Sequence, residues 1–425
     1  MGDVDEPSFS STVPAEGYII CCDCFTDIDI KAFIKSDAQD FSCDFCDRKS
    51  KTDPIAAPLE DVVSFMLEAI EREYDRAVNA LGWESAEGGF QGLHWDSYDL
   101  LTEQLSLDLP NDDGRLLSIL VDCLGDNDWC ERNPYSLRED ERYIESWEHF
   151  CQYIKHERRY FFLQRNKVST GPGNGELLSP ASMLQFLKET VLEYGFITTI
   201  PNDSTIYRAR QWKRGQQLKS SLDFGPPPTE LAIRSNRMSP AGIVMFYGSK
   251  EANTAVAEID DDPNLGISVG VFETIRKLRV LDLTLLPRPL RFFEPQPESS
   301  TENRYVISFL SSFVKSMAAK IEPGDREHID YVPTQVVTEW FRVMTSSGQS
   351  PIDGICYPSA QRAHGTSIVL FADRTQIALT AKEINEIKQR SEWNSLEDIL
   401  ITNRQENAWL RLIDVCVVRS PSTAI

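Results

Sequence analysis

Residues 242–274, GIVMFYGSKEANTAVAEIDDDPNLGISVGVFET, set the fold class of the C-terminal half. Two runs rich in apolar and aromatic residues, 242–249 and 265–274, are short and interrupted by glycine, which is typical of β-strands. Between them, residues 250–259 predict a helix. A strand, a helix and a second strand in this order indicate a mixed α+β domain.

Similar runs lie on both sides of this stretch. Residues 205–210, 278–284, 353–358 and 367–372 predict further strands, and residues 303–319 and 333–345 predict helices. We therefore expect one α+β domain over residues 200–378. Residues 379–425 are expected to follow it as a C-terminal extension, with one helical pattern and a strand-like run at 412–418.

The N-terminal half has a different pattern. Apolar residues recur three and four positions apart over residues 59–81, which is the spacing of an amphipathic helix. Further helical patterns at 97–107, 114–125 and 141–158 predict an all-α bundle over residues 55–165. Residues 1–16 are acidic and rich in serine and proline, so we expect a disordered tail. Residues 166–199 are expected to form a connector and a helix.

Five of the ten cysteines lie close together, in the order Cys21-x2-Cys24, eighteen residues, Cys43-x2-Cys46, with Cys22 as an extra thiol. Two such pairs at this separation are typical of a four-cysteine zinc ribbon, which we place at residues 17–50. Cys22 is an alternative ligand to Cys21. Because four thiolates fill a tetrahedral Zn²⁺ shell, the predicted site is structural.

The net charge of −23 bears on possible partners. An acidic surface repels phosphate backbones, so nucleic acid is a disfavoured partner. No apolar run is long enough to span a bilayer, and the N-terminus does not resemble a signal peptide, so we expect a cytoplasmic protein without a membrane partner. An anionic ligand would need arginines of its own.

Four stretches of the C-terminal half, in this order, resemble the RES domain family. They are TIYRAR with Arg208, IRSNRMSPAGIVMFYGS with Arg237 and Tyr247, EANTAVAEI with Glu258, and YPSAQRAHGTSIVLF with Ser359. One departure is Asn-Arg-Met around Arg237, where the family has Gly-Arg-Trp. The resemblance implies an ADP-ribosyltransferase-like fold.

The resemblance also implies that the protein consumes NAD⁺ by cleaving its nicotinamide–ribose bond, as a glycohydrolase or a phosphorylase. The implied role is that of a toxin or a phage-defence effector, with an antitoxin or a defence partner protein. Glu258, Arg208 and Ser359 are the expected catalytic residues. Arg208 and Ser359 are also expected to bind NAD⁺, together with Arg237 and Tyr247. Arg210 competes with Arg208, because alternation along a strand places both on one face.

The helical bundle resembles the HEPN-type domains that precede RES domains. HEPN ribonucleases use an arginine followed by a histidine, but the position expected for the histidine after Arg132 is Leu137. Three alternatives stay open: an ADP-ribosyltransferase acting on a protein, a HEPN-type ribonuclease, and a non-catalytic partner-binding protein. The helical domain is also a candidate surface for homodimer formation.

Overall fold

The computed structural model describes residues 13–86, 88–110, 112–162, 177–259, 262–295, 301–319, 326–343, 351–389 and 395–421. The chain divides into two compact units. The first takes the described residues up to Arg142 and those of Pro289–Ser308. The second takes the described residues of Tyr143–Ser169, Glu176–Arg288 and Phe309–Ile425. Each unit is described by itself.

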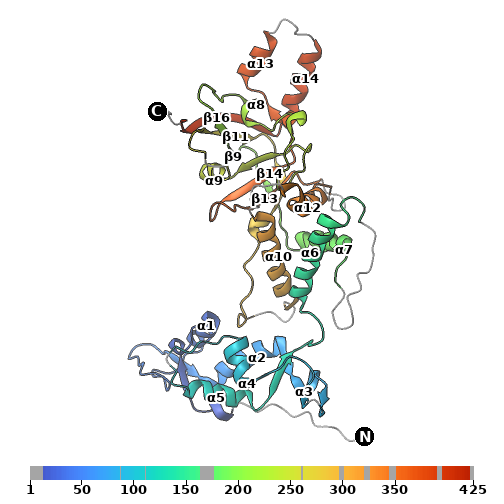
Figure 1. Cartoon of the computed structure of the whole chain (residues 1–425). Coiled ribbons are helices and arrows are strands. Elements are labelled where there is room, and N and C mark those ends of the chain that lie inside the picture. The colour runs from blue at the N-terminus through green and yellow to red at the C-terminus, as the bar shows by residue number, and fades with distance from the viewer. Residues whose placement is uncertain are drawn as a thin grey trace. The chain divides into compact units, whose positions relative to one another are not determined.

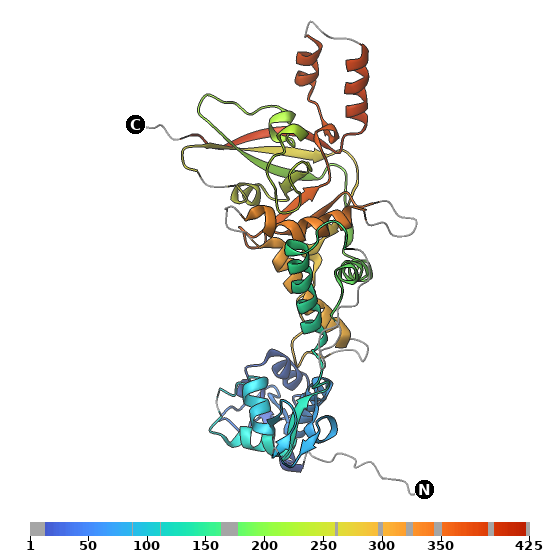
Figure 2. The same ribbon diagram turned by 45° about the vertical axis from the view of Figure 1, so that its right-hand side comes forward.

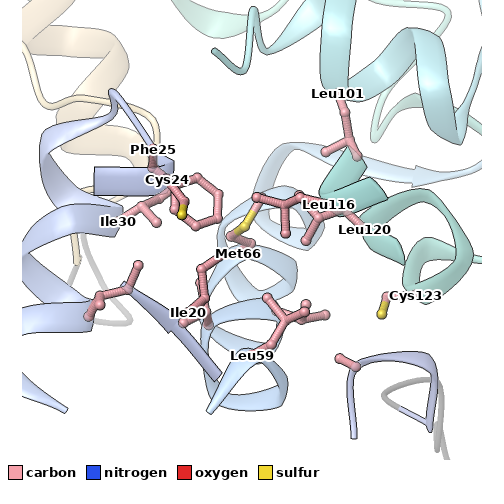
Figure 3. Close-up of a cluster of buried hydrophobic side chains, with 14 of the residues drawn as sticks. Ile20, Cys24, Phe25, Ile30, Leu59, Met66, Leu101, Leu116, Leu120 and Cys123 are labelled. Atoms are coloured by element: carbon pink, nitrogen blue, oxygen red, sulfur yellow. The ribbon is translucent and has the colours of Figure 1, made fainter. Parts of the chain in front are cut away.

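The first unit begins with its cysteine-rich segment. Strand β1 (Ile19–Cys21) pairs antiparallel with β2 (Ala56–Pro58), and the chain between them forms η2 (Cys22–Cys24) and α1 (Ile28–Ser36). Helices α2 (Leu59–Glu73) and α5 (Arg115–Leu124) pack against this segment in one hydrophobic core (Figure 3). The core includes Ile20, Phe25, Ile30, Met66 and Leu120. The predicted ribbon and the predicted bundle therefore share a core.

Short strands interrupt the helical region. A three-stranded sheet has the order β3 (Tyr74–Arg76), β7 (Asp128–Glu131), β6 (Trp95–Asp96), and β4 (Trp83–Glu84) pairs with β5 (Gly89–Phe90). The expected helix over 59–81 ends at Glu73, because Tyr74 is extended and pairs with Glu131. The remaining elements are η1 (Val13–Ala15), α3 (Ala77–Ala80), α4 (Ser97–Asp99) and the π-helical turn η3 (Leu100–Gln104).

Two of the predicted boundaries that concern the first unit need correction. Residues 13–15 of the expected disordered tail form η1, because Ala15 is fully buried in the core; residues 1–12 lie outside the described residues. The Pro289–Ser308 segment, which we expected in the α+β domain, belongs to the first unit. There Phe293 is 3% exposed in the core, and Arg291 donates to both carboxylate oxygens of Asp29.

The second unit is built on a nine-stranded sheet in the order β15-β16-β11-β9-β10-β14-β13-β12-β8. Figures 1 and 2 show this sheet with helices on its flanks. The strands are β8 (Ile197–Ile200), β9 (Thr205–Trp212), β10 (Phe246–Ser249), β11 (Gly266–Thr274), β12 (Leu278–Asp282), β13 (Gly354–Pro358), β14 (Thr366–Leu370), β15 (Ile377–Ala378) and β16 (Leu410–Arg419). The mixed α+β class is confirmed.

The sheet extends beyond the expected domain limits of 200 and 378. Strand β8, from the expected connector, pairs with β12, and β16, from the expected C-terminal extension, pairs with β11 along Ile267–Thr274. Leu410 and Leu412 of β16 are buried in the core of the sheet. The extension is thus an integral part of the α+β unit, because it covers an edge that β11 would otherwise expose.

Helices complete the second unit. They are α6 (Glu139–His156), α7 (Pro180–Glu193), α8 (Ser221–Phe224), α9 (Ala252–Ala257), α10 (Thr301–Ala318), α11 (Glu327–Asp330), α12 (Val332–Val343), α13 (Ala381–Lys388) and α14 (Ser395–Glu406), with the 3-10 turns η4 (Thr229–Leu231), η5 (Leu283–Leu285) and η6 (Arg374–Gln376). The first residues of α6, Glu139–Arg142, and of α10, Thr301–Ser308, belong to the first unit. In the described part of the chain, none of the helices has the length and apolarity to cross a membrane.

The expected bundle over 55–165 is also divided. Tyr143 of α6 stacks on Phe186 of α7 with ring centroids 4.3 Å apart, and Trp147 meets Phe313 of α10 edge-on at 5.1 Å. The described residues of the expected bundle from Tyr143 to Phe162 therefore belong to the second unit. Residues 163–176 of the expected connector lie outside the described residues.

Candidate active site

A pocket of about 260 Å³ lies where β9, β10 and α9 meet the β13–β14 hairpin. Its lining combines two arginines, a carboxylate, two tyrosines and two serines, which is a polar set for a pocket of this size. The lining residues are Arg208, Ala209, Arg210, Asn236, Tyr247, Gly248, Ser249, Ala255, Glu258, Ile259, Tyr357 and Ser367.

Arg208 is buried, and no acidic side chain among the described residues pairs with it. Its side chain leaves the middle of β9, its guanidinium lies 4.8 Å from the centre of the Phe246 ring, and the residue is 7% exposed. Among the described residues, nothing hydrogen-bonds to its buried Nη1 atom. Burial, and next the positive charge of Arg210, lower the pKa of Arg208 well below its ordinary value. Since an unpaired buried charge is costly, this guanidinium is set to receive an anion.

Arg210 faces the same pocket, two positions along β9. Its Nη2 atom donates to the carbonyl of Gly225 at 3.0 Å, and its buried Nε atom has no partner among the described residues. Burial lowers the pKa of Arg210. The alternation expected for a strand thus brings both arginines to one site.

Glu258 lies at the C-terminal end of α9, and hydrogen bonds from both ends of this helix connect it to β14. Glu251, at the other end of α9, accepts hydrogen bonds from Thr254 Oγ1 and from the backbone N–H of Thr366. The carboxylate of Glu258 is held separately: its Oε1 atom accepts from Ser359 Oγ at 2.5 Å and from Ser367 Oγ at 2.9 Å. Among the described residues, no donor reaches its Oε2 atom.

The two serines meet Glu258 because of the hairpin between β13 and β14. Tyr357 pairs with Ser367 in this hairpin, and the loop after β13 is closed by a hydrogen bond from Ser359 N to Gly365 O at 2.8 Å. Ser359 was predicted from the resemblance to the RES family, whereas Ser367 was not predicted. The signal that would have found Ser367 is the pairing of two strands, which residue periodicity does not reveal.

Tyr247 lines the pocket beside the arginines and contacts the hydroxyl of Ser239 at 2.9 Å. Burial raises the pKa of Tyr247 to about 12, so its phenol is neutral at physiological pH. Tyr357, on β13, is 5% exposed, and burial raises the pKa of its phenol as well. The pocket therefore offers neutral aromatic surfaces next to its charged groups.

Three of the five predicted site residues line the pocket. These three are Arg208, Tyr247 and Glu258. Ser359 is not a lining residue, but its hydroxyl donates a hydrogen bond to Glu258. Arg237 is not a lining residue either. Helix α12 holds the loop around Arg237 instead: Thr334 Oγ1 donates to the Arg237 carbonyl, and Gln335 Nε2 donates to that of Asn236. Arg237 nevertheless lies close to the pocket, because its charge acts on Tyr247 and Tyr357, and its buried Nε atom, like that of Arg210, has no hydrogen-bond partner among the described residues.

The four predicted metal ligands in the first unit also converge. The sulfur atoms of Cys21, Cys24, Cys43 and Cys46 all lie within 4.8 Å of one another. Three of the separations are 3.9, 3.5 and 3.6 Å, and thiolates around tetrahedral Zn²⁺ are about 3.8 Å apart, given a Zn–S bond of about 2.3 Å. Backbone N–H groups of Cys21 and Phe45 donate to Cys43 Sγ.

Cys22, the alternative ligand, turns away from this cluster and contacts Asp23 Oδ1 at 3.6 Å. Cys21, Cys24 and Cys43 are buried. The cluster is therefore a closed site that can hold a metal ion, and its donor set fits Zn²⁺.

Comparison with known families identifies two domains in the chain. A model of the HEPN/RES N-terminal domain 1 matches residues 36–168, and a model of the RES domain matches residues 205–393. Searches of curated proteins and of solved structures found no match. At the family level, a RES domain carries a toxin-like, NAD⁺-related function. The chain belongs to the RES-domain family, with an HEPN/RES N-terminal domain 1 in front of its RES domain.

Proposed function

We propose that the RES domain binds NAD⁺ and cleaves the bond between nicotinamide and ribose. The observation that carries the proposal is the pairing, in one pocket, of two groups: the buried guanidinium of Arg208, whose Nη1 atom has no hydrogen-bond partner among the described residues, and the carboxylate of Glu258, which two hydroxyls fix. The first group suits an anion and the second suits a developing cation, and NAD⁺ presents both.

The arginines are suited to the diphosphate. A guanidinium donates two parallel hydrogen bonds to phosphate oxygens, and it does so most strongly where water is excluded. In a chain of net charge −23, Arg208 and Arg210 supply the local positive field that such a ligand needs. Binding of the diphosphate would relieve the cost of burying the two charges.

Glu258 is suited to the bond-breaking step. When the C1′–N bond breaks, its electron pair goes to the pyridinium nitrogen, so nicotinamide leaves neutral and the ribose becomes positively charged, as in glycoside hydrolysis. Ser359 and Ser367 occupy Oε1 and fix the carboxylate, while Oε2 stays available to the ribose. Tyr247 offers an aromatic face for the nicotinamide ring.

The acceptor completes the reaction. Water adding to C1′ and losing a proton makes the enzyme a glycohydrolase, and inorganic phosphate makes it a phosphorylase. Either reaction depletes NAD⁺, which supports a role as a toxin or a defence effector controlled by an antitoxin or another partner protein.

We also propose that the four-cysteine cluster binds structural Zn²⁺, because its four thiols match that ion.

The test is incubation of the purified protein with NAD⁺, with and without phosphate, followed by chromatography of the products. Nicotinamide with ADP-ribose indicates hydrolysis, nicotinamide with phosphorylated ADP-ribose indicates phosphorolysis, and ADP-ribose attached to protein indicates a transferase. Glu258→Gln should abolish nicotinamide release. The matched control is Glu339→Gln, which changes an exposed glutamate of α12 in the same unit. Intact NAD⁺ under both conditions would contradict the proposal.

A further inference from the structure

Strand β16 covers the edge of β11, but most of its own outer edge has no neighbouring strand. On that side β15 reaches only Leu410 and Arg411, through Ile377 and Ala378. Beyond Arg411, no strand among the described residues pairs with the outer edge of β16. The backbone N–H and C=O groups of such an edge bond readily to a strand of another molecule, so this edge is a candidate interaction surface.

The free part of β16 carries exposed apolar side chains. Ile413, Val417 and Val418 are 50%, 62% and 55% exposed, although all three are large and β-branched. Val415, between Ile413 and Val417, is half-buried. Apolar side chains that gather on one exposed strand indicate contact with another molecule, because covering them removes apolar surface from water.

The free edge is limited at both ends. On the N-terminal side β15 occupies it as far as Arg411, and on the C-terminal side Pro421 has no N–H to donate. Residues 412–420 remain between these limits. A second copy of the same segment, running antiparallel, has the same length and the same limits. Two copies related by a two-fold axis present identical patches to each other, which is the commonest arrangement of a homodimer.

One antiparallel register makes the segment complementary to itself in charge. When the two-fold axis passes between Cys416 and Val417, Asp414 of each copy lies opposite Arg419 of the other. Opposite charges directly across two strands are stabilising. A parallel arrangement about a two-fold axis would instead place the two copies of Asp414 side by side. The other positions then pair apolar side chains or the thiol with valine: Val415 with Val418, and Cys416 with Val417.

The centre of this register is regular strand, because β16 pairs with β11 without interruption from Asp414 to Val417. We propose that the outer edge of β16 is a dimer interface, at which two copies of this chain pair antiparallel through residues 412–420. The two nine-stranded sheets then join edge to edge. None of the residues that line the candidate active site comes from β16, so this inference does not depend on the proposed function.

Charge reversal tests the register. The full chain should sediment as a dimer, and Asp414→Arg and Arg419→Asp should each raise the Kd of the dimer about ten-fold or more, because each variant places like charges opposite one another twice. The double variant Asp414→Arg/Arg419→Asp again pairs opposite charges, so it should regain most of the wild-type affinity. The matched control is Glu406→Arg, at an exposed position of α14 in the same unit, which should sediment like the wild type.

Two results of the sedimentation experiment would overturn the inference. A wild-type chain that stays monomeric would show that the edge does not bind a second copy. A dimer that forms equally well in the wild type and in both single variants would show that the copies associate through another surface, such as the helical domain.

Disulfide trapping tests the same register independently of affinity. Because Cys416 lies opposite Val417 of the second copy, Val417→Cys should form a covalent dimer under mild oxidation, visible on a non-reducing gel. Ile413→Cys is the matched control, since its position is also exposed, at 50% against 62%, but lies opposite Ser420. Equal cross-linking of the two variants, or none in either, would contradict the proposed register.

Discussion

The hydroxyl of Ser359 donates a hydrogen bond of 2.5 Å to Oε1 of Glu258, although 101 positions separate the two residues in the chain. Ser367 donates to the same oxygen from the neighbouring strand at 2.9 Å. The carboxylate that we propose to stabilise the ribose cation is therefore oriented from both sides of one hairpin, by the loop after β13 and by β14, and its position depends on both hydroxyls.

Removing these hydroxyls tests this dependence. A hydrogen bond to a charged group contributes about 1.5–3 kcal/mol, so we expect Ser359→Ala and Ser367→Ala each to lower kcat for nicotinamide release by about 10-fold or more. The loss of kcat in the double variant should approach the loss expected for Glu258→Gln. Ser312→Ala, at an exposed position of α10, is the control, because the hydroxyls that donate to Glu258 are those of Ser359 and Ser367. Unaltered kcat in both single variants would exclude an orienting role.

Metal removal should destabilise the first unit. Cys21 and Cys24 belong to the same core as Phe25, Ile30 and Met66 (Figure 3), so loss of the ion would loosen packing beyond the cysteines. Structural zinc contributes about 10 kcal/mol or more in zinc-finger peptides, and here we expect a loss of several kcal/mol. The measurements are zinc content and denaturant unfolding before and after treatment with a chelator.

Two cysteine variants test which thiols bind the zinc ion. Cys43→Ser should lose the ion, because Cys43 is one of the four convergent thiols, whereas Cys22→Ser should retain it. Equal zinc content in the wild type and in Cys43→Ser would show that the cluster is not the binding site.

Strand β16 should be indispensable, although it lies beyond the residues that match the RES domain. A chain ending at residue 393 would expose the edge of β11 over Ile267–Thr274 and lose the burial of Leu410 and Leu412. Each buried leucine contributes about 1.5–3 kcal/mol, so we expect unfolding or aggregation of the shortened chain. A chain ending at residue 421 retains β16 and should unfold at the same denaturant concentration as the full chain.

The raised pKa of Tyr247 predicts a specific loss of stability at alkaline pH. Burial raises this pKa from 10.0 to about 12, so between these values the folded state holds a proton that the unfolded state releases. The contribution of this proton to the free energy of unfolding is fully present below pH 10.0. It is lost as the pH rises toward 12, at up to about 1.4 kcal/mol per pH unit.

Tyr247→Phe cannot titrate, which makes it the comparison for this prediction. The unfolding free energy of the wild type should fall relative to that of the variant as the pH rises above 10.0. Their difference should stay constant between neutral pH and about pH 9. Parallel curves across the whole range would mean that Tyr247 titrates normally in the folded protein.

Much of the site could be predicted from local sequence. The strand–helix–strand pattern around Tyr247 and Glu258 was visible because alternation and helical spacing are set by nearby residues. The four cysteine ligands were found because each pair lies within one turn of chain. Arg208 and Ser359 came from the resemblance to the RES family, which supplied their order along the chain.

The tertiary structure decided what depends on distant hydrogen bonds and shared packing. Pairing of β8 with β12 and of β16 with β11 moved both limits of the α+β domain. Pairing of Tyr74 with Glu131 ended a helix that the apolar spacing would have continued. Ser367 joined Glu258, and Arg210 rather than Arg237 lined the pocket. A strand's partner and a side chain's neighbours are fixed by residues far along the chain, and local periodicity carries no information about them.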